Sequence, residues 1–205
     1  TCANFDTTSY TCSISASSNY EANDLTIPST IVHNGVSYDL ITIGDGAFQA
    51  DQLLTGNLTF SNNLTTLKAA FAGCHNLKGQ INFTNTITSI DEFAFSSTPF
   101  TGSLILPENP SLTFLGWGTF AYCAFTSLVI PKNITMVDWS FSNVRTCVAI
   151  SCNYDTLPEF TYDEWQNTFS NWSSNGTVSN IGSLSSTDVC NYLISKGLPA
   201  GWTPA

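Results

Sequence analysis

Histidine and cysteine are the side chains of this sequence best suited to nucleophilic catalysis or metal binding. Both histidines, His33 and His75, fall in predicted turns that are far apart in the chain. A Cys74–His75 pair, or a Ser–His–Asp triad on either histidine, would need side chains to converge in a way that stacked repeats do not offer. A zinc site needs closely spaced Cys and His ligands, and Cys74 with His75 supplies too few.

Adjacent carboxylates occur at Asp91-Glu92 and Asp163-Glu164. Neighbouring residues on a strand or helix point apart, so neither pair forms a glycosidase-like acid and base by itself. We therefore predict that the chain is not an enzyme and uses no metal or cofactor. A glycosidase hidden in the C-terminal region is the catalytic alternative.

Aspartate also recurs shortly before a repeated phenylalanine, at Asp45, Asp91 and Asp138. A ladder of calcium sites would need an acidic residue in every row, but Lys68 and Gly116 stand in the other rows. Turn formation explains these aspartates better, because their side chains bond to the backbone of tight turns.

The charge balance excludes several partners. Only 10% of the residues are charged, and 15 acidic against 5 basic residues give a net charge of -10. Such a chain repels phosphate backbones and anionic lipid surfaces, so we expect neither nucleic acid nor a membrane surface as partner. The sequence has no apolar run near the ~20 residues that span a bilayer.

The chain opens at Thr1-Cys2 without methionine or signal peptide, which we interpret as a mature or trimmed chain. Low charge, seven cysteines and six N-glycosylation sequons together favour an extracellular or cell-surface location. The sequons are candidate glycosylation sites and begin at Asn57, Asn63, Asn82, Asn133, Asn171 and Asn175.

An internal repeat dominates the sequence. A small residue followed by phenylalanine recurs at nearly regular intervals, ending on Phe48, Phe71, Phe95, Phe120 and Phe141. An apolar pair precedes each phenylalanine, and a short alternating apolar stretch follows it. These stretches begin at Leu58, Ile81, Leu104, Leu128 and Val148.

Each alternating stretch predicts a short strand with its apolar side chains on one face. One such strand cannot bury that face alone, but copies stacked about 4.8 Å apart form a parallel sheet. The phenylalanine column then fills the interior from the opposite wall. The sequence therefore predicts a strand-rich α/β solenoid.

Several segments resemble the BspA-like leucine-rich repeats: Leu25–Pro28, Ile41–Phe48, Ile87–Phe95 and Phe100–Pro107. The resemblance covers roughly residues 25–151. It implies a right-handed leucine-rich-repeat solenoid with the parallel sheet on its concave face. It also implies adhesin-like attachment to host cells or matrix proteins, and no catalytic residues. Plant-type repeats are the alternative, suggested by Leu54–Leu58 and Leu77–Ile81, but the asparagine ladder of that type is missing.

We predict three parts: an N-terminal cap over residues 1–39, five repeats of about 23 residues over 40–151, and a C-terminal cap over 152–205. Asn34-Gly35 between β-forming residues predicts a hairpin in the first cap. The second cap should hold two short helices, over 162–170 and from Thr187 to Lys196. A separate functional module in 152–205 is the alternative.

Seven cysteines leave at least one thiol unpaired. Cys2 and Cys12 could form a disulfide within the N-terminal cap, and Cys190 could form one with Cys152 or else with Cys147. Cys74 and Cys123 are two rows apart, a separation of about 10 Å that is beyond disulfide reach. We interpret these two as buried thiols that act as small hydrophobic residues.

The outward face of the concave strands is the candidate binding surface. We expect a host-cell-surface or matrix protein to contact it, without nucleic acid and without a membrane span. A structural stalk that displays another module is the alternative function. The predicted ligand-binding residues are Thr55, Asn57, Thr59, Lys78, Gln80, Asn82, Thr101, Ser103, Ile105, Ser127, Val129 and Arg145, with Ala149 beside them.

Overall fold

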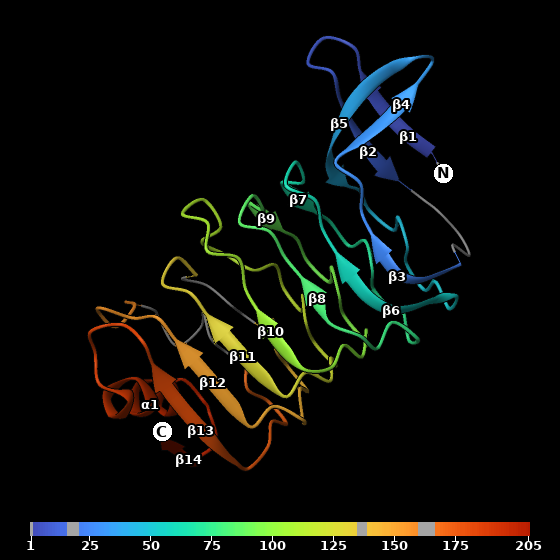
Figure 1. The fold of residues 1–205 in the computed structure, drawn as a ribbon. Helices are drawn as coiled ribbons and strands as arrows, with labels where there is room; N and C mark the ends of the chain where they lie inside the picture. Colours follow the sequence, from blue (N-terminus) through green and yellow to red (C-terminus); the bar gives the residue numbers. More distant parts are fainter. Residues whose placement is uncertain (1, 16–20, 135–138, 160–166) are drawn as a thin grey trace.

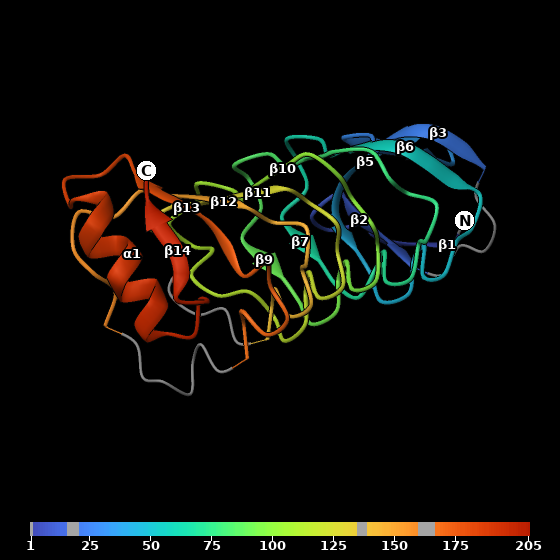
Figure 2. The same ribbon diagram turned by 90° about the horizontal axis from the view of Figure 1, so that it is seen from below.

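The chain forms an elongated solenoid whose coils stack one after another (Figures 1 and 2). The computed structural model describes residues 2–15, 21–134, 139–159 and 167–205. The coils run along three walls: a wall of parallel strands, a second wall that holds parallel strands in the N-terminal half of the chain, and a wall of turns that contain the repeated phenylalanine. We call these the strand wall, the second wall and the Phe wall.

The strand wall consists of two parallel sheets that follow one another along the solenoid, edge strand beside edge strand. They meet where the Thr101 N–H donates to Gly79 O at 3.0 Å. Pairing in register places Leu104, Leu128 and Ile150 in one buried row. The sheets contain β3 (Ala22–Thr26), β6 (Leu54–Thr59) and β8 (Ile81–Asn82), then β10 (Ser103–Ile105), β11 (Ser127–Ile130), β12 (Ala149–Cys152), β13 (Asn175–Asn180) and β14 (Gly201–Pro204).

The second wall continues into the N-terminal region. Its strands are β1 (Cys2–Asp6), β2 (Thr11–Ser15), β4 (Thr30–His33), β5 (Val36–Ile43), β7 (Thr66–Leu67) and β9 (Ser89–Ile90). Strands β2, β5, β7 and β9 are parallel neighbours, whereas β1 and β4 pair antiparallel to β2 and β5. The predicted hairpin is present, because β4 and β5 flank Asn34 and Gly35, which both have positive φ.

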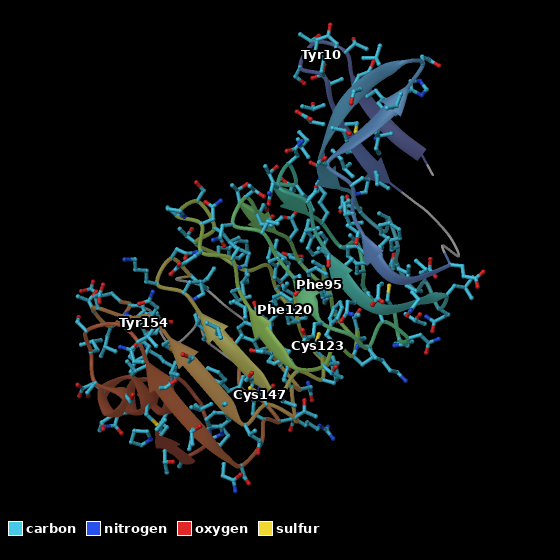
Figure 3. All side chains as sticks on the ribbon, viewed as in Figure 1. Tyr10, Phe95, Phe120, Cys123, Cys147 and Tyr154 are labelled. Atoms are coloured by element: carbon cyan, nitrogen blue, oxygen red, sulfur yellow. The ribbon has the colours of Figure 1, made fainter. Side chains whose placement is uncertain are left out.

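Five phenylalanine rings stack through the interior, as the repeat predicts. Successive rings from Phe48 to Phe141 lie 4.9, 5.6, 5.3 and 5.7 Å apart between centroids, with interplanar angles of 9° or less. Figure 3 labels two members, Phe95 and Phe120. Backbone hydrogen bonds also join successive coils; for example, Phe71 N–H donates to Ala94 O at 2.9 Å. Each coil is therefore joined to the next by ring stacking and by hydrogen bonds.

A second buried column supplies donors to the phenylalanine carbonyls. The residue three places after the repeated phenylalanine bonds back to the phenylalanine of the preceding coil. The Cys74 thiol donates to Phe48 O at 3.0 Å, the Thr98 hydroxyl to Phe71 O at 2.6 Å, and the Cys123 thiol to Phe95 O at 3.3 Å. Cys74 and Cys123 are thus buried free thiols, as predicted, but they also satisfy backbone acceptors.

The Phe wall extends one coil beyond the predicted repeats. Thr168 and Phe169 form a further small-Phe pair, which follows Phe141 after a longer interval than any in the repeats before it. Asn143 N–H donates to Ser170 O at 2.8 Å, and the Trp172 indole donates to Phe141 O at 2.6 Å. Trp172 therefore takes the donor position of this extra coil.

The strand wall also extends past both predicted boundaries. Strand β3 lies within the segment predicted as N-terminal cap, yet it pairs in parallel with β6. Strands β13 and β14 lie within the predicted C-terminal cap, yet they continue the parallel sheet. Both segments fold as coils because each offers an inward apolar residue, Leu25 and Val178, to the neighbouring strand.

One helix of the predicted C-terminal pair is described. Helix α1 (Ser186–Ser195) follows the N-cap Ser185, whose hydroxyl accepts from Asp188 N–H at 3.0 Å, and it begins one residue before the predicted start at Thr187. Gly197, with φ of 104°, follows the C-cap. The helix packs on β13 and β14 at the end of the stack. Most of the helix predicted over 162–170 lies outside the described residues, and residues 167–170 form a turn.

Replacing Thr98 by valine tests the donor column. The change keeps the side chain's shape but leaves the buried Phe71 carbonyl without its hydroxyl donor. We expect Thr98→Val to lower the free energy of unfolding by about 1–3 kcal/mol in urea titrations. Thr98→Cys is the control, because cysteine donates from the equivalent position in two other coils, and it should be the milder change. A Thr98→Val variant as stable as the parent would contradict this role for the column.

Candidate functional site on the strand wall

The outward side chains of the strand wall form one continuous, partly exposed surface. Strand alternation turns leucine and isoleucine inward and leaves hydroxyl, amide and small side chains outward. We call this surface the strand face. It comprises Thr55, Asn57, Thr59, Lys78, Gln80, Asn82, Thr101, Ser103, Ile105, Ser127, Val129, Ala149, Ser151, Thr177 and Ser179.

Parallel pairing aligns this surface into rows across the coils. One row runs Ser103, Ser127, Ala149, Thr177, and the next runs Ile105, Val129, Ser151, Ser179. Ile105 is 57% exposed and lies beside Val129, so the centre of the strand face is apolar. The rest of the face carries neutral polar and small groups, with Lys78 as its one charged member. The surface therefore suits a partner that combines an apolar contact with hydrogen bonds.

The N-terminal rows of the strand face are held by side-chain hydrogen bonds. Asn57 Nδ2 donates to Asp24 Oδ1 at 2.8 Å, while Asn57 Oδ1 accepts from Gln80 N–H at 2.8 Å. Asp24 also accepts from Asn57 N–H at 2.7 Å. A Cβ on Gly56, which has φ of 74°, would lie only 2.5 Å from that carboxylate. Glycine is thus required at position 56, where the Asp24 carboxylate packs against the backbone of β6. The hydrogen bonds of Asn57 hold its side chain in place before any partner binds.

Eleven of the twelve predicted ligand-binding residues lie on the strand face, and Arg145 does not. Arg145 follows Phe141 by four residues, as His75 follows Phe71, so it occupies the turn at the corner with the Phe wall. Ser151, Thr177 and Ser179 belong to the face but were not predicted. Their alternation with Ile150, Cys152 and Val178 was the available signal.

The histidines occupy separate structural positions. The His33 ring stacks on Phe5 with centroids 4.3 Å apart, and His75 Nδ1 donates to Ser97 O at 3.1 Å. Asp163, Glu164 and Asp138 lie outside the described residues. Among the residues that the structure describes, no group of three or more His, Cys, Asp or Glu side chains could hold a metal ion.

The predicted disulfides are wrong for this structure, in which Cys12, Cys147, Cys152 and Cys190 are all free thiols. In the β1–β2 pair, Cys12 lies opposite Phe5, while Cys2 lies opposite Ser15. The two cysteines are therefore three positions out of register, about 10 Å along the strand and beyond disulfide reach.

The C-terminal pairing fails for a similar geometric reason. Cys152 lies on β12, whereas Cys190 lies on α1, which packs on β13 and β14. Strand β13 lies between β12 and β14, so the two thiols belong to different coils. Cys147 instead donates to Ala149 O at 3.4 Å.

The sequon asparagines differ in how strongly the fold engages them. Asn133 is half-buried, and its Nδ2 donates to Pro107 O and Leu112 O at 3.3 and 2.7 Å. Asn63 Nδ2 donates to Ser29 O and to Asp39 Oδ1. Asn175 is exposed at the start of β13. A glycan at Asn133 would break two hydrogen bonds to the backbone, so the fold favours Asn175 over Asn133 as an acceptor.

Coils of short parallel strands around a leucine and phenylalanine interior define a leucine-rich-repeat solenoid. The sequence matches the BspA type leucine-rich repeat region in six copies over residues 22–148. This chain therefore belongs to the BspA type leucine-rich-repeat family. The matched region begins in β3, one coil before the first predicted repeat.

Two solved structures are similar to this chain. One is a leucine-rich repeat protein from Bacteroides ovatus, at 16% identity and a TM-score of 0.26, covering 88% of this chain and 70% of that one. The other is a leucine rich cell surface protein from Faecalibacterium prausnitzii, at 12% identity and a TM-score of 0.27, covering 90% and 74%. No curated protein matches the sequence. Within the described residues, no helix has the length and apolar character to cross a bilayer.

Thiol reactivity tests the cysteine environments. Burial raises the pKa of Cys74, Cys147 and Cys152 to about 12, and burial also raises that of Cys123. The reactive thiolate is therefore disfavoured at about pH 8, and we expect these four thiols to resist Ellman's reagent in the native protein and to react once guanidinium unfolds it.

The same pKa shifts set the direction of the pH dependence. A raised folded-state pKa means that the unfolded chain releases thiol protons first, so stability should fall from about pH 9 upward toward pH 12. The measurement uses a Cys2→Ser variant, so that only the six buried thiols can be labelled. Rapid native labelling of Cys74 or Cys123 would contradict this assignment.

Proposed function

We propose that this chain is a non-catalytic, adhesin-like module that binds a host-cell-surface or extracellular-matrix protein through the strand face. Its membership of a leucine-rich-repeat family supports a protein-binding role. The observation that carries the proposal is the aligned, exposed surface with Ile105 and Val129 at its centre. The proposal places the protein at the cell surface or outside the cell.

Rigidity is the physical advantage of the strand face. Its side chains project from paired strands, and several, such as Asn57 and Thr101, already bond to neighbouring coils. Thr101 donates to Lys78 O at 2.7 Å. Binding then orders few groups, which reduces the entropic penalty of association.

The size of the surface indicates how a partner would use it. The face spans six strands about 4.8 Å apart, which makes it about 24 Å long, and two or three outward residues per strand make it up to about 15 Å wide. The resulting area of roughly 360 Å² is well below the ~800 Å² per partner of a typical stable interface. A partner would therefore also contact the corners, where Arg145 and His75 lie.

Charge placed at the apolar centre tests the proposal. We expect Ile105→Glu with Val129→Glu to weaken binding to cultured epithelial cells and to immobilised matrix proteins by about tenfold or more, because an unpaired charge would be buried at the contact. Flow cytometry and surface plasmon resonance would measure it. Val32→Glu is the control for an added glutamate elsewhere, since Val32 is 69% exposed on β4, away from the strand face.

The outcomes separate the competing functions. Loss of binding in the double variant with retention in Val32→Glu supports the strand face. Equal binding by both variants would show that contact occurs elsewhere. Absence of binding by the parent chain to any cell or matrix protein would favour the structural stalk.

A further inference from the structure

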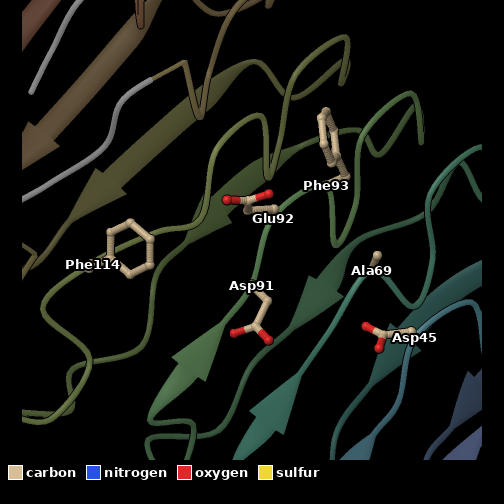
Figure 4. A pocket seen from close by; sticks show the side chains of 6 residues that line it. All are labelled: Asp45, Ala69, Asp91, Glu92, Phe93 and Phe114. Carbon is tan, nitrogen blue, oxygen red and sulfur yellow. The ribbon is translucent and has the colours of Figure 1, made fainter.

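A hollow of about 440 Å³ opens where the second wall turns into the Phe wall (Figure 4). Its lining combines aromatic rings with carboxylates from different coils. We call this site the aromatic cradle and define it by Asp45, Ala69, Asp91, Glu92, Phe93 and Phe114. It uses different walls from the strand face.

The cradle exists because one coil carries alanine where the next carries phenylalanine. Ala69 precedes Phe71 by two residues, the position that Phe93 holds before Phe95. The small side chain leaves space beside the Phe93 ring. Phe93 has a φ of 56°, and its ring meets Trp117 edge-on, with centroids 4.9 Å apart.

The Phe93 and Trp117 rings are packed against neighbours but remain open to solvent. A Cβ on Gly118 would lie 3.0 Å from the Phe93 ring, so the ring can pack this closely on the backbone only because residue 118 is glycine. Trp117 also lies against Trp139, with ring centroids 5.5 Å apart. Phe93, Trp117 and Phe114 remain 38%, 40% and 45% exposed. A cluster of exposed aromatic rings of this kind is typical of an interaction site.

Three carboxylates surround these rings. Asp91 accepts from the Ser89 hydroxyl at 2.6 Å, which orients its carboxylate, while Asp45 and Glu92 are exposed. Figure 4 shows Glu92 between the Phe93 and Phe114 rings, with Asp91 below Glu92 in the view. The site therefore presents concentrated negative charge next to aromatic faces.

The nearby basic residues line other hollows. Lys68, on the intervening coil, lines a hollow with Asp6 and Thr66, and Lys132 lines one with Glu108. The chain has only 5 basic residues in total. Three carboxylates against the one neighbouring Lys68 leave the cradle with net negative charge that a cation from outside can neutralise.

We propose that the aromatic cradle binds an arginine side chain presented by a segment of a partner protein. A guanidinium group stacks on aromatic rings and bonds to carboxylates in the same plane, which matches this combination of groups. An anionic ligand would be repelled by the three carboxylates, and a purely apolar ligand would desolvate them without compensation. The hollow is large enough for the arginine and its flanking backbone.

A labelled peptide, acetyl-Gly-Arg-Gly-Arg-Gly-amide, is the probe. Its binding is measured by fluorescence anisotropy at low ionic strength, beside the same peptide with citrulline, which keeps the shape of arginine without its charge. We expect the arginine peptide to bind at least about tenfold more tightly than the citrulline peptide, and the difference to shrink as salt is added.

Variants of the full chain locate the binding. Asp91→Asn with Glu92→Gln should weaken the arginine peptide by about tenfold, and Phe114→Ala should weaken it severalfold. Glu21→Gln with Glu159→Gln is the charge-matched control, because both carboxylates are exposed and lie outside the cradle. It should bind as the parent does. Thermal melts of every variant establish that each is folded.

Three results would overturn the proposal: no binding of the arginine peptide, equal binding of the citrulline peptide, or equal weakening by the control pair. Equal binding of the citrulline peptide would indicate a neutral ligand. The Ile105→Glu, Val129→Glu variant should bind the arginine peptide normally, so failure at the cradle and failure at the strand face are distinguishable.

Discussion

The carbonyl oxygen of each repeated phenylalanine must find donors inside an apolar interior, and this requirement governs the whole stack. The carbonyls of Phe48, Phe71, Phe95 and Phe120 accept from their own turns, as Phe71 O does from Cys74 N–H at 3.4 Å. Most of the five carbonyls accept from a side chain of the next coil. Thr98 and Trp172 are chemically different residues that serve the same acceptor position. Ring stacking brings the coils together, and these bonds fix how each coil meets the next.

The repeat could be predicted from sequence because its signal is periodic and local. Phenylalanine spacing located the interior, strand alternation located eleven residues of the strand face, and Asn34-Gly35 located the hairpin. The ends were harder, since the unusually long step from Phe141 to Phe169 concealed another coil. The disulfides were mispredicted because cysteine counts carry no strand register, and register separates Cys2 from Cys12.

The cradle was missed for a different physical reason. Each of its aspartates is an ordinary turn residue when considered within its own coil. Their proximity to Phe93 and Phe114 follows from stacking, and the hollow depends on the small Ala69 next to a large neighbour. Side chains that lie one or two whole repeats apart in sequence meet only because the coils are placed side by side. The two surfaces differ in chemistry as a result: the strand face is hydroxyl-rich with one lysine, and the cradle is acidic and aromatic.

The coils differ in length, from the short step between Phe120 and Phe141 to the long step that ends at Phe169, while the stacking of the rings from Phe48 to Phe141 hardly changes. Extra residues are therefore absorbed at the bends, outside the interior. Because each coil touches mainly its two neighbours, gene duplication or loss of one coil would lengthen or shorten the molecule and leave its interior intact. A lineage could in this way change the span of its contact surfaces in steps of about 4.8 Å without evolving a new core.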